Sequence, residues 1–244
     1  MAKGRKPGTR SRRKPAPRRR GFTLRDILRW AGRGVAAVAG VWLFFVLLFT
    51  VVNPAVTPYM LAESWRQGGV SRDWVDLEEM APEVALSVVA AEDANFCLHW
   101  GFDMRAIRAA LDEGAGRGAS TITQQVVKNV FLWQGRSWPR KALEAVMTPV
   151  VELVWSKRRI VEVYLNVAET GNGLFGVEAA AEAYFGRPAA DLRPGQAALI
   201  AAALPDPKGR NPSRPSGFLR ARAAVIADGA ATIRADGRAA CFED

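Results

Sequence analysis

Cysteine and histidine are almost missing from this sequence. Its 244 residues include two cysteines, Cys97 and Cys241, and one histidine, His99. Two cysteines cannot form a disulfide framework, and with a single histidine they do not provide the four ligands of a structural zinc site. A single bridge between Cys97 and Cys241 stays open, because such a bond depends on an oxidising compartment.

Acidic residues are scarce only near the N-terminus. Residues 1–33 contain thirteen Lys and Arg and one acid, Asp26, whereas the remaining residues contain 21 basic and 23 acidic groups. The net charge of +10 therefore belongs to a tail. Because nucleic-acid binding needs a basic face on the folded domain, we expect no nucleic-acid partner. Residues 3–20 contain Pro and Gly and lack apolar periodicity, so no regular structure is expected there.

One long stretch carries no charge. Residues 34–52 read GVAAVAGVWLFFVLLFTVV, and a helix of this length spans about 28 Å, close to the hydrocarbon thickness of a bilayer. The apolar part of a signal peptide is shorter, and no small-residue cleavage motif follows Val52. We therefore expect a membrane helix at residues 34–54. Basic residues are retained in the cytoplasm, which places residues 1–33 inside and residues 55–244 outside.

The exported part reads as helices interrupted by Gly and Pro. No run alternates apolar and polar residues with a period of two, so we expect an all-α domain. Thr121, with Gln124 three residues later, fits a capping box on a helix that runs to about Phe131. The longest helical pattern covers residues 140–165, and Pro149 should kink or split it. Further helices are expected at residues 82–91, 104–111, 178–184, 195–204 and 218–233.

The first of four polar clusters covers residues 92–103. Glu92 and Asp93 follow an apolar helix, and burial there would raise the pKa of a carboxyl group toward that of a general base. Adjacent carboxylates at a helix end are also common structural features. His99, taken alone, is more typical of a hydrogen-bonded structural residue than of a ligand.

Two further clusters suit an anionic group. At residues 118–129 a glycine-containing turn leads into a helix N-terminus, where free N–H groups and the helix dipole attract anions. At residues 136–144 three cations and Glu144 lie within nine positions, which fits a diphosphate site. A routine ion pair between Arg140 and Glu144 is the alternative. The aromatic residues at 131–138 indicate either core or a lip on the membrane interface.

The fourth cluster runs from Tyr164 to Gly186. Its glycines do not match the G-x-G-x-x-G frame of a dinucleotide site, and no predicted strand precedes them. We interpret this segment as a tight turn between helices that shapes the wall of a cleft.

In this order the four clusters resemble those of the peptidoglycan glycosyltransferases, glycosyltransferase family 51, over residues 88–216. The motifs are ED-x-x-F-x-x-H-x-GFD, STITQQ-x-x-KN, RK-x-x-E and YLN. The short anchor and the text VAETGNGLFGVEAAAEAYFG are similar to those of monofunctional biosynthetic transglycosylases of Gram-negative bacteria. One departure is Ala119, where the family usually has a second glycine. No transpeptidase domain is expected, because 28 residues follow Ser216 and there is no K-T-G motif.

The resemblance implies a two-lobed, lysozyme-like helical fold that polymerises lipid II into glycan strands and releases undecaprenyl diphosphate. It implies that Glu92 is the general base and that Glu144 is a second essential glutamate on the donor side. The expected substrate-binding residues are Asp93, Phe96, His99, Ser120, Thr121, Gln124, Gln125, Lys128, Asn129, Arg136, Arg140, Lys141 and Asn166.

The expected partners are lipid II, the growing glycan strand and the cell inner membrane, together with cell-division or penicillin-binding proteins. No cofactor is required by the sequence, and Mg²⁺ or Mn²⁺ at the diphosphate stays open. Two other classes share part of these features. A hydrolytic glycosidase would also use a catalytic glutamate but needs no cationic diphosphate site, and a membrane scaffold would leave the four clusters without a role.

Overall fold

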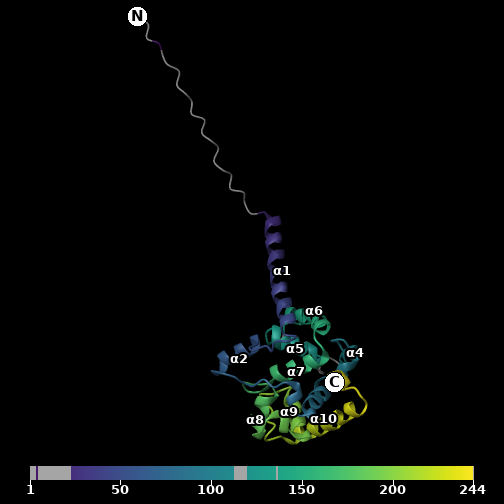
Figure 1. Cartoon of the computed structure of the whole chain (residues 1–244). Coiled ribbons are helices and arrows are strands. Elements are labelled where there is room, and N and C mark those ends of the chain that lie inside the picture. The colour runs from purple at the N-terminus through teal and green to yellow at the C-terminus, as the bar shows by residue number, and fades with distance from the viewer. Residues whose placement is uncertain (1–3, 5–22, 113–119, 136, 244) are drawn as a thin grey trace. The chain divides into compact units, whose positions relative to one another are not determined.

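The structure is a computed structural model that describes residues 4, 23–112, 120–135 and 137–243. Most of the basic tail, together with Ala119 and Arg136, lies outside the described residues. The chain divides into two compact units, Met1–Trp42 and Leu43–Asp244. Figure 1 labels most of the helices.

Helix α1 spans Leu24–Leu48 and contains most of the uncharged stretch. Thr23 and Asp26 fix its first turn: the Asp26 N–H donates to Thr23 Oγ1 (3.3 Å), and the Thr23 N–H donates to the Asp26 carboxylate (3.2 Å). This reciprocal cap starts the helix ten residues before the uncharged stretch begins. By length and composition α1 can cross a membrane.

The last turn of α1 belongs to the second unit. Val46 is fully buried there, and the Trp155 indole N–H donates to the Val46 carbonyl oxygen at 2.7 Å. The Arg159 guanidinium donates to the carbonyl oxygens of Phe49 (2.9 Å) and Val52 (3.0 Å), which follow the helix. Because this segment provides buried apolar surface and backbone acceptors, it is part of the folded unit, and a fragment that keeps the fold must include it.

The second unit is mainly helical, as the sequence predicts. Helices α3, α4, α5, α8, α9 and α10 confirm the expected bounds to within two residues at each end. The elements are α2 (Pro58–Gln67), β1 (Ser71–Arg72), η1 (Leu77–Glu79), α3 (Pro82–Glu92), η2 (Phe96–Leu98), α4 (Met104–Asp112), α5 (Ile122–Phe131), α6 (Trp138–Val154), α7 (Lys157–Val167), β2 (Glu169–Gly171), β3 (Leu174–Phe175), α8 (Val177–Phe185), η3 (Ala189–Asp191), α9 (Pro194–Ala203), α10 (Gly217–Ala235) and α11 (Ala240–Glu243).

Two groups of helices form the core. Helices α3, α9 and α10 pack on one another, and α5 packs on both α6 and α7. Helix α9 is rich in alanine and almost wholly buried, and its small side chains let α3 and α10 approach closely. Figure 1 shows α9 and α10 on the side of this unit away from α6. This mainly helical architecture fits the lysozyme-like fold that the resemblance implies.

Two short strands of a small sheet lie in the segment from Tyr164 to Gly186, where the sequence predicted only a turn. β2 and β3 pair antiparallel and β1 pairs parallel with β3, which gives the order β1–β3–β2. Gly173 forms the turn of the β2–β3 hairpin with a φ of +70°, a conformation that favours glycine. Strands of two or three residues are too short to show a period-two pattern, which is why none was expected.

The predicted split at Pro149 is wrong in its position. Helix α6 continues through Pro149 to Val154, and the chain breaks at Trp155 and Ser156. Ser156 has an extended backbone, and its Oγ accepts from the Arg159 N–H at 3.1 Å, which caps α7. A new N-cap, and not the proline, therefore divides residues 140–165 into two helices.

Cys97 and Cys241 form a disulfide, which decides the question that the sequence left open. The bridge joins η2, directly after the first polar cluster, to the short C-terminal helix α11. Phe242 beside it is buried, so α11 (Ala240–Glu243) packs on the folded unit. Disulfides of this kind persist in oxidising compartments.

Candidate active site

The polar clusters meet where α3 ends, α5 begins and the first turns of α6 pass. Helix α3 begins with Pro82 at its first turn and has an almost continuous apolar sequence, most of which is buried. Asp93 caps it with an extended φ of −162°, which ends the helix directly after Glu92. The last helical residue of a buried helix thus presents a half-buried carboxylate.

Three side chains form a hydrogen-bonded chain that ends on Glu92. The Tyr164 hydroxyl donates to Gln125 Oε1 at 3.0 Å, and the Gln125 amide donates to Glu92 Oε2 at 2.8 Å. Tyr164 is buried, so its hydroxyl fixes which end of the Gln125 amide faces the carboxylate. Burial raises the pKa of Glu92, while Gln125, Arg222 and Lys128 act in the opposite direction without cancelling the shift.

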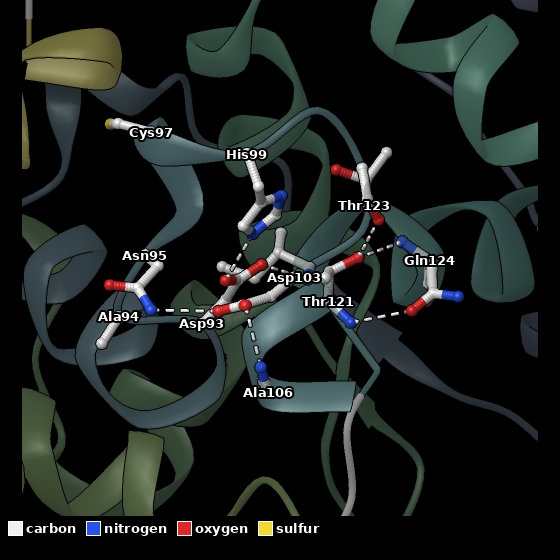
Figure 2. Close-up of polar contacts among 12 residues, drawn as sticks. Asp93, Ala94, Asn95, Cys97, His99, Asp103, Ala106, Thr121, Thr123 and Gln124 are labelled. Atoms are coloured by element: carbon white, nitrogen blue, oxygen red, sulfur yellow. Dashed lines mark hydrogen bonds and ion pairs between the residues drawn. The ribbon is translucent and has the colours of Figure 1, made fainter. Parts of the chain in front are cut away.

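Asp93 has a different task from its neighbour. One of its oxygens lies 2.8 Å from His99 Nε2, and the other accepts from the Ile122 N–H, the first residue of α5, at 3.0 Å. Figure 2 shows Asp93 between His99 and the start of α5. Both oxygens are occupied and the side chain is buried, so Asp93 holds the end of α3 against the N-terminus of α5.

Buried contacts also support His99 and Phe96. The Lys157 ammonium donates to the His99 carbonyl oxygen (2.8 Å), pairs with Glu152 (2.9 Å) and lies 4.2 Å from the centroid of the Phe96 ring. The hydroxyl of Thr123, on α5, donates to Glu152. Phe96 is fully buried, which gives it a packing role. These contacts tie the segment after Glu92 to α5 and α7.

The predicted capping box is confirmed. The Thr121 N–H donates to Gln124 Oε1 (3.1 Å), and the Gln124 N–H donates to Thr121 Oγ1 (3.3 Å). The Thr121 hydroxyl donates in turn to the Gly101 carbonyl oxygen at 2.7 Å. Thr121 and Gln124 are both buried, so they shape the start of α5, while Ser120 and Gln125 beside them remain partly accessible.

A second carboxylate organises the cations. Glu144 is buried and pairs with both Arg140 and Lys141. Lys141 also donates to Ser120 Oγ at 3.1 Å, and the Arg140 Nε–H donates to a backbone carbonyl oxygen at 2.9 Å. The ion pair considered as an alternative is therefore present, and it is part of a three-residue group. A cavity of about 310 Å³ opens beside this group, lined by Ser137, Trp138, Arg140 and Lys141.

The charges of both carboxylates act on Lys128. Burial lowers the pKa of Lys128, whereas the charges of Glu144 and Glu92 act to raise it. The site therefore combines a carboxylate with a raised pKa, a group of cations around Glu144, and a lysine that responds to the charges of both carboxylates.

Two expected substrate-binding residues are hydrogen-bonded to other parts of the chain. Asn166 is fully buried, accepts from the Val75 N–H at 3.0 Å and donates to the Val75 carbonyl oxygen at 2.8 Å, so its amide is used by the backbone. Asn129 is buried and accepts from Gln134 Nε2 at 3.1 Å. Arg136 lies outside the described residues.

Tyr164 and Arg222 were not among the expected site residues. Tyr164 belongs to the YLN motif, so the motif itself was a signal, although its partner Gln125 lies 39 positions away. Arg222 lies on α10 and acts on Glu92 through its charge, and its buried Nε has no hydrogen-bond partner among the described residues. No local pattern indicates Arg222, because only the packing of α10 on α3 brings it to the site.

Comparison with known proteins gives the same family throughout. The transglycosylase family model matches residues 60–231. A biosynthetic peptidoglycan transglycosylase of Jannaschia sp. is 59% identical over 88% of this chain and 90% of its own length. Proteins with the same description from Cronobacter sakazakii and Pectobacterium carotovorum are 47% and 49% identical, each over 83% of this chain and over 89% and 88% of their own lengths.

The neighbours Glu92 and Asp93 should respond differently to loss of their charge. Because folding raises the pKa of Glu92, its ionised form costs stability above the folded-state pKa, and this cost disappears below the unfolded-state pKa, about 4.3. Glu92→Gln should therefore match or exceed the wild-type free energy of unfolding at pH 7, with no relative gain below about pH 4. Urea denaturation in detergent at both pH values measures this.

Asp93→Asn is the matched comparison. An asparagine has one oxygen for the two donors that Asp93 now accepts from, so its NH₂ must face either His99 or the Ile122 N–H. We expect a loss of about 1–3 kcal/mol in the free energy of unfolding at pH 7. An equal loss in Glu92→Gln would contradict the separate roles assigned to these residues.

Proposed function

The chain belongs to the transglycosylase family, and from this premise we propose how its residues polymerise lipid II. The protein is a peptidoglycan glycosyltransferase that extends glycan strands in cell-wall synthesis. The observation that supports the assignment of roles is the placement of Glu92, whose pKa is raised by burial, beside a group of cations built around Glu144.

Glu92 acts as the general base. The 4-hydroxyl of the acceptor sugar attacks C1 of the donor sugar from the face opposite the diphosphate, so the new glycosidic bond forms as the C1–O bond to undecaprenyl diphosphate breaks. Glu92 takes the hydroxyl proton, and the electron pair of the broken bond leaves on the diphosphate. A raised pKa makes the carboxylate a stronger proton acceptor at neutral pH. Gln125 and Tyr164 hold the carboxylate in place.

The cations receive the diphosphate. Lys128, Arg140 and Lys141 stabilise the negative charge that grows as the bond breaks, and Ser120 orients an oxygen beside Lys141. Glu144 is a positioning residue in this scheme, because its two ion pairs keep Arg140 and Lys141 directed toward one place. For a leaving diphosphate, stabilisation of the growing negative charge matters more than transfer of a proton to it.

Mg²⁺ or Mn²⁺ at the diphosphate, which the sequence leaves open, stays a prediction. Glu144 is already paired with two cations, and within the described residues no group of three or more His, Cys, Asp or Glu side chains is placed to hold a metal ion. We therefore assign no step to Mg²⁺ or Mn²⁺.

Helix α1 fits a single-pass membrane protein. We propose that residues 1–33 are cytoplasmic and that the catalytic unit is periplasmic, at the inner membrane, where lipid II presents its sugars. The basic charge of the tail and the Cys97–Cys241 bridge both support this orientation. Partners among cell-division or penicillin-binding proteins stay a prediction.

A topology reporter tests the orientation. A reporter that works only in the periplasm should be active when fused after Asp244, because the charge difference across α1 retains the N-terminus inside. The same reporter fused before residue 34 is the control and should be inactive. Activity only at the N-terminal fusion would overturn the proposed compartment.

Lys128→Ala should lower kcat more than it raises KM for lipid II. The ammonium meets charge that develops in the transition state, and losing such a group costs on the order of 10²-fold or more in rate. Arg214→Ala, which removes an exposed cation that belongs to none of the groups described above, is the matched control and should keep wild-type rates. Strand lengthening from lipid II, resolved by product size, is the assay. A higher KM at an unchanged kcat would place Lys128 in simple substrate binding, and shortened strands would indicate a hydrolase.

A further inference from the structure

The C-terminus folds back over the segment that follows Glu92. Helix α10 ends at Ala235 and is capped by Asp236, Gly237 reverses the chain with a φ of +76°, and α11 follows. We name residues 236–243 the C-terminal strap. They contribute nothing to the reaction steps above, yet they lie against the part of the chain that carries Asp93 and His99.

The strap is attached to this segment at two points. Cys241 is disulfide-bonded to Cys97, and the Arg238 guanidinium donates to the Ala94 carbonyl oxygen at 3.2 Å. These attachments flank buried Phe96, and both lie within the short loop between Asp93 and His99. In Figure 2 the Cys97 side chain points away from the Asp93–His99 pair, so the bridge holds the loop from the outside.

The strap itself is firmly held. Phe242 is buried, and the Arg158 guanidinium donates to the Phe242 carbonyl oxygen at 3.2 Å while it pairs with Glu78 at 2.9 Å. Asp236 fixes the Arg238 guanidinium through an ion pair of 2.8 Å. Helix α11 packs on α7 and on η2. Because α7 holds Phe242 and the end of α10 holds Arg238, the strap restricts the movement of the loop to which it is attached.

We propose that the C-terminal strap positions the short loop between Asp93 and His99. Cys97, Cys241 and Arg238 are positioning residues that act through Asp93 on Glu92. This inference rests on the function proposed for Glu92. Asp93 follows Glu92 directly and cannot shift without moving it. The loop is short, so holding its backbone at positions 94 and 97 restricts the angles at which Asp93 meets His99 and the start of α5.

The bridge makes this positioning depend on redox state. Both cysteines are partly accessible, so a dithiol can reach the bond. Reduction transfers two electrons and two protons from the dithiol, which becomes a cyclic disulfide, and leaves two free thiols at Cys97 and Cys241. Arg238 then remains as the single attachment of the two described above.

The experiment compares five samples of the full chain in detergent. These are oxidised wild type, wild type reduced with dithiothreitol, the Cys97→Ala/Cys241→Ala double variant, Arg238→Ala and the control Arg220→Ala. Arg220 lies on α10, and its guanidinium donates to the Pro215 carbonyl oxygen just before that helix. The readouts are kcat and KM for lipid II and amide hydrogen exchange, measured well below the unfolding temperature of the least stable sample.

We expect kcat to fall roughly 10-fold or more on reduction and in the double variant, with KM within about twofold, because small misplacement of a catalytic group costs rate and not affinity. Arg238→Ala should show a smaller fall and Arg220→Ala none. The amides of Phe96 and Leu98, which donate to Asp93 and Asn95 carbonyl oxygens, should exchange faster while those of α9 do not change. Reoxidation should restore kcat in wild type, and the reductant should not alter the double variant.

Three results would overturn the inference. They are unchanged kcat and exchange after reduction, a change in only one of these two readouts, and faster exchange that includes α9, which would indicate general destabilisation. If oxidised wild type does not polymerise lipid II, the proposed function fails by itself. The exchange of Phe96 and Leu98 then still decides whether the strap holds the loop.

Discussion

Asp93 joins the helix that carries Glu92 to the helix that carries Gln125 and Lys128. Its two oxygens accept from two donors on different elements, His99 and the backbone of Ile122, so the end of α3 cannot move relative to the start of α5 without breaking a buried hydrogen bond. An unpaired buried donor costs about 1–3 kcal/mol, which makes this contact restrictive. The buried capping box, the Lys157 contacts and the C-terminal strap all hold parts of the same junction.

This junction brings two different electrostatic environments close together, one around Glu92 and one around Glu144. Burial at the end of α3 favours the neutral form of Glu92, while Lys128 and Arg222 favour its ionised form, and burial prevails. On the other side Glu144 gathers Arg140 and Lys141, which would otherwise repel each other. The base gains a proton in one part of the site and the leaving group gains negative charge in another, and the charges of Glu92 and Glu144 both act on Lys128.

Local patterns allowed most of the helices and the capping box to be predicted, because caps, glycines and apolar spacing act within a few residues. The pattern gave the wrong place for the division of residues 140–165, because the N-cap at Ser156 and not Pro149 separates the two helices. It also missed the strands, which are too short to show a period of two. Motif order indicated Glu92, Glu144 and Lys128, but it gave no sign that the Asn166 amide bonds to the backbone of Val75, which is 91 positions away. The disulfide and the approach of Arg222 depend on tertiary packing alone.

Polymerisation of lipid II by purified Glu92→Gln protein tests the central claim most directly. Glutamine keeps the size of the side chain and one acceptor oxygen, but it cannot take a proton at neutral pH. The rate should fall by about 10²–10⁴-fold while lipid II binding and the fold persist, and the acidic limb of the wild-type pH–rate profile should show an apparent pKa above about 4.3. Near-normal strand synthesis by this variant would contradict Glu92 as the base.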